Sequence, residues 1–458
     1  MSLTKNSIVW GVFLGSMALT NMLVAESRQY PLEVFPAEHK HMTDEKTGVA
    51  LTFLTTSESR DINLYFHDQS WLADGSLILF TSNRERGGVM GYLTDTGELV
   101  RIATPEGRTN GPTAARQRNS VFVLRENNVL ELALDIAPAD TPDGGASTVI
   151  ATERRIATIP QSGRRTALNE SSDGKWLSVG LSDFEDGSGP LILIINVATG
   201  EIRELCRLPE PPGYGYHVQW SLTNPNLLSF ASHSEDDTDF AGPPRPNKGP
   251  TDYRNRRQRI WVVDIRNGIP HNVYHALEGE LVTHESWWVD DQILFSGGTR
   301  SDPPVEQHVK LLNIYTGQVR IIGAGAWWPD GQPETLAKWS WWHASGSEDG
   351  RWVAADNFHG DIMLFEGNTT RPHLLTQGHR VYGRGPHLHV GWDRKGEQVV
   401  FTSDKLGPAN VCIATIPEAL QQLVENNTDG LGAVQKDNQT ADMDNDAMGT
   451  RELCTHEH

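Results

Sequence analysis

Cysteine and positive charge are both scarce in this chain of 458 residues. Its three cysteines, Cys206, Cys412 and Cys454, are too few for a disulfide-rich scaffold, and none has metal-ligand spacing to another. The 39 Lys and Arg residues are outnumbered by 59 Asp and Glu, which gives a net charge of −20. This excess argues against binding nucleic acid or an anionic membrane surface. The fold must therefore depend on a large core, and an acidic substrate would need a locally positive site.

Long amphipathic helices and a Gly-x-Ser-x-Gly nucleophile motif are also lacking. The second absence bears on one class of exported protein, the peptidases that carry a propeller beside an α/β hydrolase domain. The chain has neither the motif nor room for the following domain. We therefore set that class aside.

The first 25 residues predict a secretory signal peptide. Lys5 supplies a basic start, Ile8 to Leu19 form a short apolar stretch, and small residues continue to Ala25, a plausible cleavage point. The apolar run is short for a membrane span, although an uncleaved anchor is the alternative. Cleavage would place the mature protein in the periplasm or outside the cell, without membrane contact.

A recurring phrase organises the mature chain: a turn with Asp-Gly or a substitute, followed by a short apolar strand. Asp-Gly between β-rich runs is a hairpin signal, because these residues accept positive φ. The clear copies are Ser70–Arg84, Asn169–Asp183, Gln219–His233, Ser286–Arg300, Ser345–Asn357 and Gly391–Lys405. A weaker copy surrounds Ser120, and second hairpins lie between the copies.

The spacing predicts an all-β fold, a seven-bladed β-propeller over residues 26–420. One four-stranded unit recurs per roughly 45–60 residues, close to the length of propeller blades. The segment Glu235–Arg259 is rich in proline, glycine and charge and is expected to form a long loop. Residues 421–458 lack apolar periodicity and are expected to be a disordered acidic tail.

Histidines precede the inner strands of four expected blades. These residues are His217, His284, His343, His387 and His389. A single buried histidine is more often structural than a ligand. His387 and His389, however, are two residues apart, so in an extended chain they point to the same face. With His284 nearby, the pair predicts a metal site, and imidazoles suit Zn, Cu, Fe or Ni, or Mn with added oxygen ligands.

Two elements carry a resemblance to a known family. Thr-His-Glu-x-Trp at 283–287 and His-x-His at 387–389, together with the strand phrases from Tyr30 to Leu420, resemble the oligogalacturonate lyases. Members of that family are seven-bladed propellers that cleave short galacturonate chains by β-elimination with a bound divalent metal, usually manganese. The resemblance thus implies a lyase with a divalent cofactor and an acidic oligosaccharide substrate.

Matching positions carry the family's roles to this chain as expectations. The resemblance implies metal ligands at His284, His387 and His389. It implies active-site histidines at His217 and His233, of which His217 is preferred as the base because it opens an inner strand. Arg259 is expected to bind a substrate carboxylate. Arg384, Tyr382 and His343 are expected near the substrate, the first two beside the leaving oxygen.

One position departs from the family's pattern. Where the family has a glutamine ligand three residues before His-x-His, this chain has Arg384. A guanidinium cannot coordinate a cation. Either Glu285 or Gln377 supplies the missing oxygen, water fills the position, or the site binds an anion or has lost its activity.

Two functions follow as hypotheses. The first is an exported lyase that cleaves uronate oligomers by metal-assisted β-elimination. The alternative is a propeller that binds carbohydrate or a protein partner without catalysis, which the loss of the glutamine favours.

Overall fold

The structure is a computed structural model whose described residues cover most of the expected propeller. These residues are 27–85, 87–138, 146–160, 163–182, 184, 189–207, 214–233, 259–276, 280–299, 307–325, 340–357, 359–379 and 387–424. The predicted signal peptide, the tail beyond Val424, and the segment with Tyr382 and Arg384 lie outside them. Within the described ranges, no helix is both long enough and apolar enough to cross a membrane.

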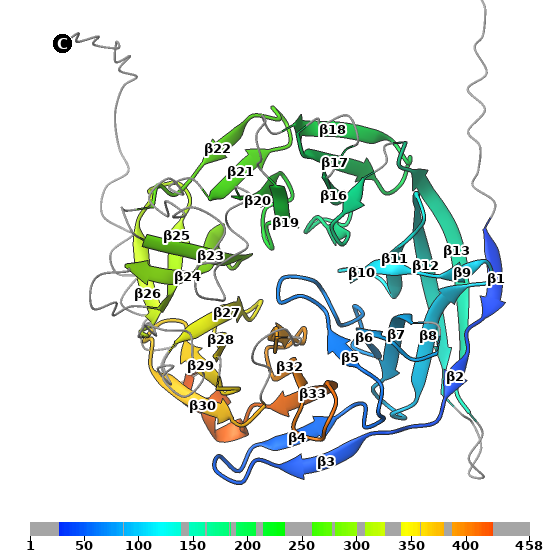
Figure 1. Ribbon diagram of the computed structural model, residues 1–458, viewed down its shortest axis with the longest axis horizontal. Coiled ribbons are helices and arrows are strands. Elements are labelled where there is room, and N and C mark those ends of the chain that lie inside the picture. Colours follow the sequence, from blue (N-terminus) through cyan, green and yellow to red (C-terminus); the bar gives the residue numbers. More distant parts are fainter. Residues whose placement is uncertain are drawn as a thin grey trace, which may run out of the picture.

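The described residues form seven antiparallel sheets arranged as a ring around a central axis, which we call the channel axis (Figure 1), so the predicted seven-bladed β-propeller is confirmed. Neighbouring blades cover both faces of each sheet. Middle strands are therefore continuously apolar rather than alternating; Leu191–Asn196, with the sequence LILIIN, is buried along nearly its whole length.

Blades 1 to 3 come from the first half of the chain. Blade 1 consists of β5 (Asp61–Asn63), β6 (Leu77–Ser82), β7 (Gly88–Leu93) and β8 (Leu99–Thr104), with β2 (Val34–Phe35) and β9 (Gly107–Arg108) paired to β8. Blade 2 consists of β10 (Asn110–Ala114), β11 (Ser120–Arg125), β12 (Asn128–Ala137) and β13 (Thr148–Thr158), with β1 (Arg28–Pro31) outside. Blade 3 consists of β14 (Arg164–Arg165), β15 (Asn169–Glu170), β16 (Trp176–Ser182), β17 (Leu191–Asn196) and β18 (Ile202–Arg207).

Blades 4 to 6 are four-stranded sheets in simple sequence order. Blade 4 consists of β19 (Tyr214–Trp220), β20 (Leu227–His233), β21 (Ile260–Asp264) and β22 (Pro270–Asn272). Blade 5 consists of β23 (Glu280–Trp287), β24 (Gln292–Thr299), β25 (His308–Asn313) and β26 (Val319–Gly323). Blade 6 consists of β27 (Trp341–Gly346), β28 (Trp352–Asn357), β29 (Ile362–Glu366) and β30 (Pro372–Thr376).

Blade 7 closes the ring by joining the two ends of the propeller. It combines β31 (Gly391–Trp392), β32 (Gln398–Ser403) and β33 (Asn410–Thr415) with β4 (Ala50–Phe53) and β3 (Lys40–Thr43). The seam is the antiparallel pair β33–β4, in which Cys412 lies opposite Phe53. A short helix, residues 418–424, follows β33, and Val424 packs into the core beside this blade.

The core of the described residues consists of clusters between adjacent blades rather than one central mass. Leu79 of blade 1 shares a cluster with Val123 of blade 2, and Phe80 of blade 1 shares another with Val411 of blade 7. Indole N–H groups add links between inner strands: Trp287 donates to the carbonyl of Gln219 at 3.1 Å. The inner strands of blades 4 and 5 are thereby fixed relative to each other.

Truncation at the seam should show how much of the stability depends on closure. Phe53 is fully buried in the cluster between blades 6 and 7. We expect Phe53→Ala to lower the free energy of unfolding by about 3–5 kcal/mol, because a large cavity remains. Urea unfolding followed by tryptophan fluorescence would measure the change. Ile321→Ala, at a residue 45% exposed, serves as the control and should change stability by less than about 0.5 kcal/mol.

Candidate metal centre and channel site

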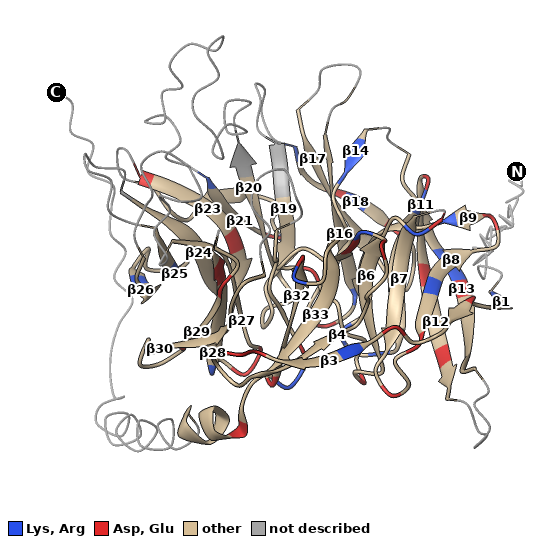
Figure 2. Cartoon of the chain, turned by 60° about the horizontal axis from the view of Figure 1, so that its bottom comes forward, with Lys and Arg blue, Asp and Glu red and all other residues tan. Residues whose placement is uncertain are grey.

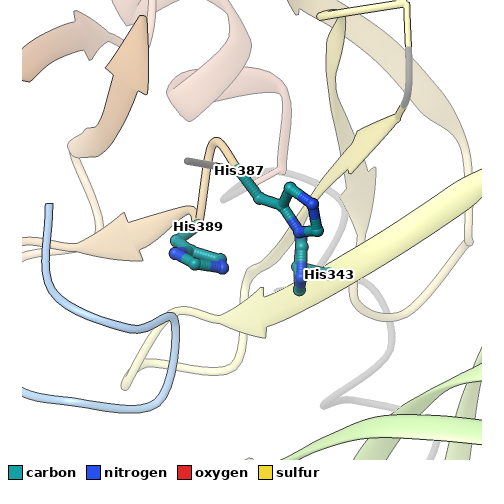
Figure 3. A group of neighbouring side chains, drawn as sticks. All are labelled: His343, His387 and His389. Atoms are coloured by element: carbon teal, nitrogen blue, oxygen red, sulfur yellow. The ribbon is translucent and has the colours of Figure 1, made fainter. Parts of the chain in front are cut away.

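Three histidines meet at one end of the channel. The ring centroid of His343 lies 5.1 Å from that of His387 and 4.6 Å from that of His389, and the latter two are 5.7 Å apart (Figure 3). One ring nitrogen from each lies within 4.8 Å of the others. We call these residues the histidine trio. A single cation could contact all three nitrogens after small adjustments.

The composition of the trio differs from the predicted ligand set in one member. His387 and His389 are together, as the His-x-His spacing predicts, but the third residue is His343, which the sequence placed near the substrate. His284, the predicted third ligand, is adjacent to His343, and the centroids of the two rings are 4.3 Å apart. The structure thus favours His343 as the third ligand, while a role for His284 in metal binding stays a prediction.

The backbone is irregular at the histidines of the inner strands and at His389. His217, His284 and His389 have φ of 51°, 54° and 51°, a left-handed conformation that costs a residue with a Cβ roughly 1–3 kcal/mol. The ladders of blades 4, 5 and 6 shift register at His217, His284 and His343 respectively. Such bulges re-aim a side chain relative to a regular strand. Equivalent bulges in successive blades therefore bring side chains from separate sheets together.

The trio has the chemistry expected of a metal site. His343 Nδ1 lies 2.8 Å from Asp356 Oδ2, and Asp356 also accepts from the backbone N–H groups of His343 and His389. His343 Nε2 is buried and has no hydrogen-bond partner among the described residues. A carboxylate on one ring nitrogen and an open second nitrogen are typical of a metal-ligating histidine. The residues therefore fit a bound divalent cation.

Burial controls protonation throughout this cluster. It lowers the pKa of His343 and of His389 well below the usual histidine value, so both rings are neutral at pH 7, as metal ligation requires. Burial also raises the pKa of Asp356 to about 7, against the opposing effect of the backbone N–H groups of His343 and His389. A nearby cation would favour the ionised carboxylate.

A second network begins at Arg259 and ends at Tyr65. Arg259 binds the Glu285 carboxylate through Nε and through Nη2, the latter at 3.1 Å. Glu285 Oε2 lies 2.9 Å from His217 Nδ1, and His217 Nε2 lies 3.1 Å from the Tyr65 hydroxyl. Burial lowers the pKa of His217 to about 4 although Glu285 opposes this. The neutral ring therefore donates from Nδ1 to Glu285 and accepts at Nε2.

This network changes the roles expected of two residues. Arg259, predicted to bind a substrate carboxylate, instead pairs with Glu285, and both side chains are almost fully buried. Burial raises the pKa of Glu285, but Arg259 and His217 outweigh it and hold the pKa well below its usual range. Both carboxylate oxygens are thus engaged, which counts against Glu285 as the substitute metal ligand. Gln377, the other candidate, follows the outer strand β30, and its backbone N–H donates to Asp44.

A loop from blade 1 enters the channel, a feature that the sequence analysis missed. β5 ends at Asn63, and the following loop runs into the centre of the ring (Figure 1). The Tyr65 ring centroid lies 4.5 Å from that of His389, and the Phe66 centroid lies 5.4 Å from that of His343. The consecutive aromatic residues Tyr65, Phe66 and His67, directly before a turn, were the sequence feature that could have indicated a functional loop.

The side chains of three predicted site residues lie outside the described residues. His233 ends β20, and its side chain lies outside the described residues. Tyr382 and Arg384 lie outside them entirely. Their assigned roles stay predictions.

Comparison with known proteins places the likeness in the fold rather than in the sequence. No protein-family model matches the chain, and no curated protein sequence matches it. A solved structure of an oligogalacturonate lyase in complex with manganese superposes with a TM-score of 0.62 at 18% identity, over 87% of this chain and 100% of that chain. The oligogalacturonate lyase of Vibrio parahaemolyticus gives 0.61 at 16% identity, over 85% and 100%. The resemblance read from the sequence is therefore confirmed for the seven-bladed architecture.

Proposed function

We propose that the protein is an exported lyase that cleaves uronate oligomers by metal-assisted β-elimination, with manganese as the cation. The observation that carries the proposal is the histidine trio, in which Asp356 pairs with His343 Nδ1 and His343 Nε2 has no hydrogen-bond partner among the described residues. The shared fold supports it, since one of the similar structures is an oligogalacturonate lyase in complex with manganese. Export is proposed because the first 25 residues resemble a signal peptide. A periplasmic or secreted location is proposed because cleavage of this peptide would release the mature protein.

The cation would be held by His343, His387 and His389. When bound, it would supply Lewis-acid stabilisation of the negative charge that develops beside the substrate carboxylate when the C5 proton is removed. Asp356 keeps His343 oriented by accepting from its Nδ1 and from its backbone N–H. The trio therefore needs this carboxylate in place before substrate arrives.

His217 is the residue best arranged to take the C5 proton. Glu285 accepts from Nδ1 and so leaves the lone pair of Nε2 directed towards Tyr65 and the channel. Arg259 fixes Glu285 in this position. Burial raises the pKa of the Tyr65 hydroxyl far above its usual value, with a further contribution from Glu285, so this hydroxyl keeps its proton and can donate to the leaving glycosidic oxygen. Once substrate replaces the hydrogen bond between these two side chains, His217 Nε2 can take the proton from C5, and Tyr65 can donate a proton to the oxygen on C4 as the C4–O bond breaks.

Activity on acidic oligosaccharides tests this function. Purified protein supplied with Mn²⁺ should convert at least one oligomer of galacturonate, glucuronate or mannuronate to an unsaturated product, detected by its ultraviolet absorbance. EDTA should stop the reaction, and added Mn²⁺ should restore it. Absence of product from every oligomer with the metal present would exclude the lyase.

A non-enzymatic binding propeller remains the second candidate because of Arg384. An arginine in place of the family's glutamine ligand favours an anion-binding site over a complete metal centre. Saturable binding of an uronate oligomer without any product, with and without Mn²⁺, would favour this candidate.

A further inference from the structure

A pocket lies beside the trio on the side of blade 3. Its volume is about 370 Å³, within the range of small-molecule pockets, and it lies between the loop from blade 1, strand β14 and the start of the inner strand of blade 4. Tyr65 and His217 form its wall towards the trio. The pocket is thus separated from the predicted metal centre by a single aromatic ring.

Two consecutive arginines make this pocket cationic in an otherwise acidic protein. Arg164 and Arg165 form β14 and line the pocket, and Figure 2 shows this strand as a basic segment near one face of the ring. Arg165 donates to Asn127 Oδ1 at 2.7 Å. Arg164 is exposed and makes no ion pair with any residue in the described ranges. Its guanidinium is therefore available to an anion.

The imidazole of His67 forms another part of the pocket wall. The His67 side chain is 8% exposed, and its Nδ1 lies 3.0 Å from Asp68 Oδ1. Its Nε2 is buried and lacks a hydrogen-bond partner within the described part of the chain. Asp68, the carboxylate in the pocket wall, is also only 8% exposed and is directed at His67 rather than at solvent. His67 therefore shapes the wall of the pocket, and its pairing with Asp68 leaves Arg164 and Arg165 as the remaining charged groups of the pocket.

We propose that this pocket binds a carboxylated sugar unit, with Arg164 on the carboxylate. The inference rests on the proposed function for its choice of ligand. The Tyr65 ring lies 4.5 Å from His389 of the trio, and its hydroxyl is 3.1 Å from His217 in the pocket wall. Neighbouring units of one chain can therefore occupy both sites. The substrate is then an oligouronide with carboxylates on successive units, not a single uronate.

Binding measured without metal tests the pocket separately from catalysis. Isothermal titration in EDTA would compare trigalacturonate and trimannuronate with their methyl esters, on wild type, Arg164→Ala and Arg164→Lys. We expect Arg164→Ala to weaken binding of the acid about 10- to 100-fold, as for loss of a charge-assisted hydrogen bond, and Arg164→Lys to weaken it less. The esters should bind wild type and Arg164→Ala equally weakly.

Arg155→Ala is the matched control. Arg155 is an exposed arginine of β13 in blade 2 that does not line the pocket, and its removal changes the net charge equally. Unchanged binding in Arg164→Ala, equal loss in Arg155→Ala, or failure of both acids to bind wild type would overturn the pocket assignment. Arg164-dependent binding without any lyase product would keep the pocket and exclude the proposed reaction. Lyase activity that does not depend on Arg164 would keep the proposed reaction and exclude the pocket.

Discussion

Replacing His343 with alanine is expected to remove stoichiometric Mn²⁺ binding and, with it, lyase activity. The trio offers three neutral nitrogens within 4.8 Å of one another, and the loss of one leaves two ligands, both on the segment before β31. Even outer-shell changes cost about 10–100-fold in metal affinity, so loss of a direct ligand should cost more. Metal analysis after dialysis, and the Mn²⁺-dependent rise in melting temperature, would measure the effect.

Companion variants distinguish the trio from the predicted ligand set. His387→Ala, at a less buried residue, should give the same loss of metal if His343→Ala fails to fold. His284→Ala should retain the metal if His343 is the third ligand, and lose it if the family's pattern holds. Asp356→Asn should weaken Mn²⁺ binding by about 10–100-fold without abolishing it. A metal-replete His343→Ala and His387→Ala protein would remove the basis of the proposed function.

Glu285→Ala is expected to lower the free energy of unfolding by about 3–5 kcal/mol, because it leaves the buried guanidinium of Arg259 without its carboxylate. The same change should abolish catalysis, since His217 Nδ1 loses the acceptor that fixes the tautomer. Urea unfolding at neutral pH would measure the stability. The double variant Arg259→Met/Glu285→Leu should recover much of it but no activity, because no unpaired charge remains buried.

The stability difference should depend on pH in a defined direction. The folded pKa of Glu285 is below its unfolded value, so the pair stabilises the protein above the unfolded carboxylate pKa of about 4.3. This contribution is lost as the pH falls towards the folded pKa. The difference between wild type and Glu285→Ala should therefore be full at neutral pH and shrink below about pH 4. A difference independent of pH would point to lost packing instead of lost charge.

The fold was predictable because a propeller repeats its own signals. The turn-and-strand phrase recurs once per blade, and each hairpin is local in sequence, so counting the copies gives the architecture. The pairing of His387 with His389 was likewise predictable from the two-residue period of an extended chain. Local rules suffice for both.

The rest of the site depends on contacts that no local rule supplies. His343 and not His284 completes the trio because of where blades 5, 6 and 7 lie relative to one another, and this placement is not visible in the sequence. Asp356 lies on the second strand of its blade, and its burial beneath His343 is a tertiary feature. Tyr65 and Phe66 reach the channel because the inner strand of blade 1 ends after three residues, which the strand pattern did not indicate.

The position of the seam has a consequence for the order of assembly. Tyr65 belongs to the first blade to leave the ribosome, whereas its neighbour His389 belongs to the last, and the two rings come into contact only once blade 7 has packed against blade 1. A nascent or C-terminally truncated chain therefore lacks a competent centre however many of its blades have formed. Under the proposed function, activity would therefore be reached only late in folding, at the step that brings the last blade against the first.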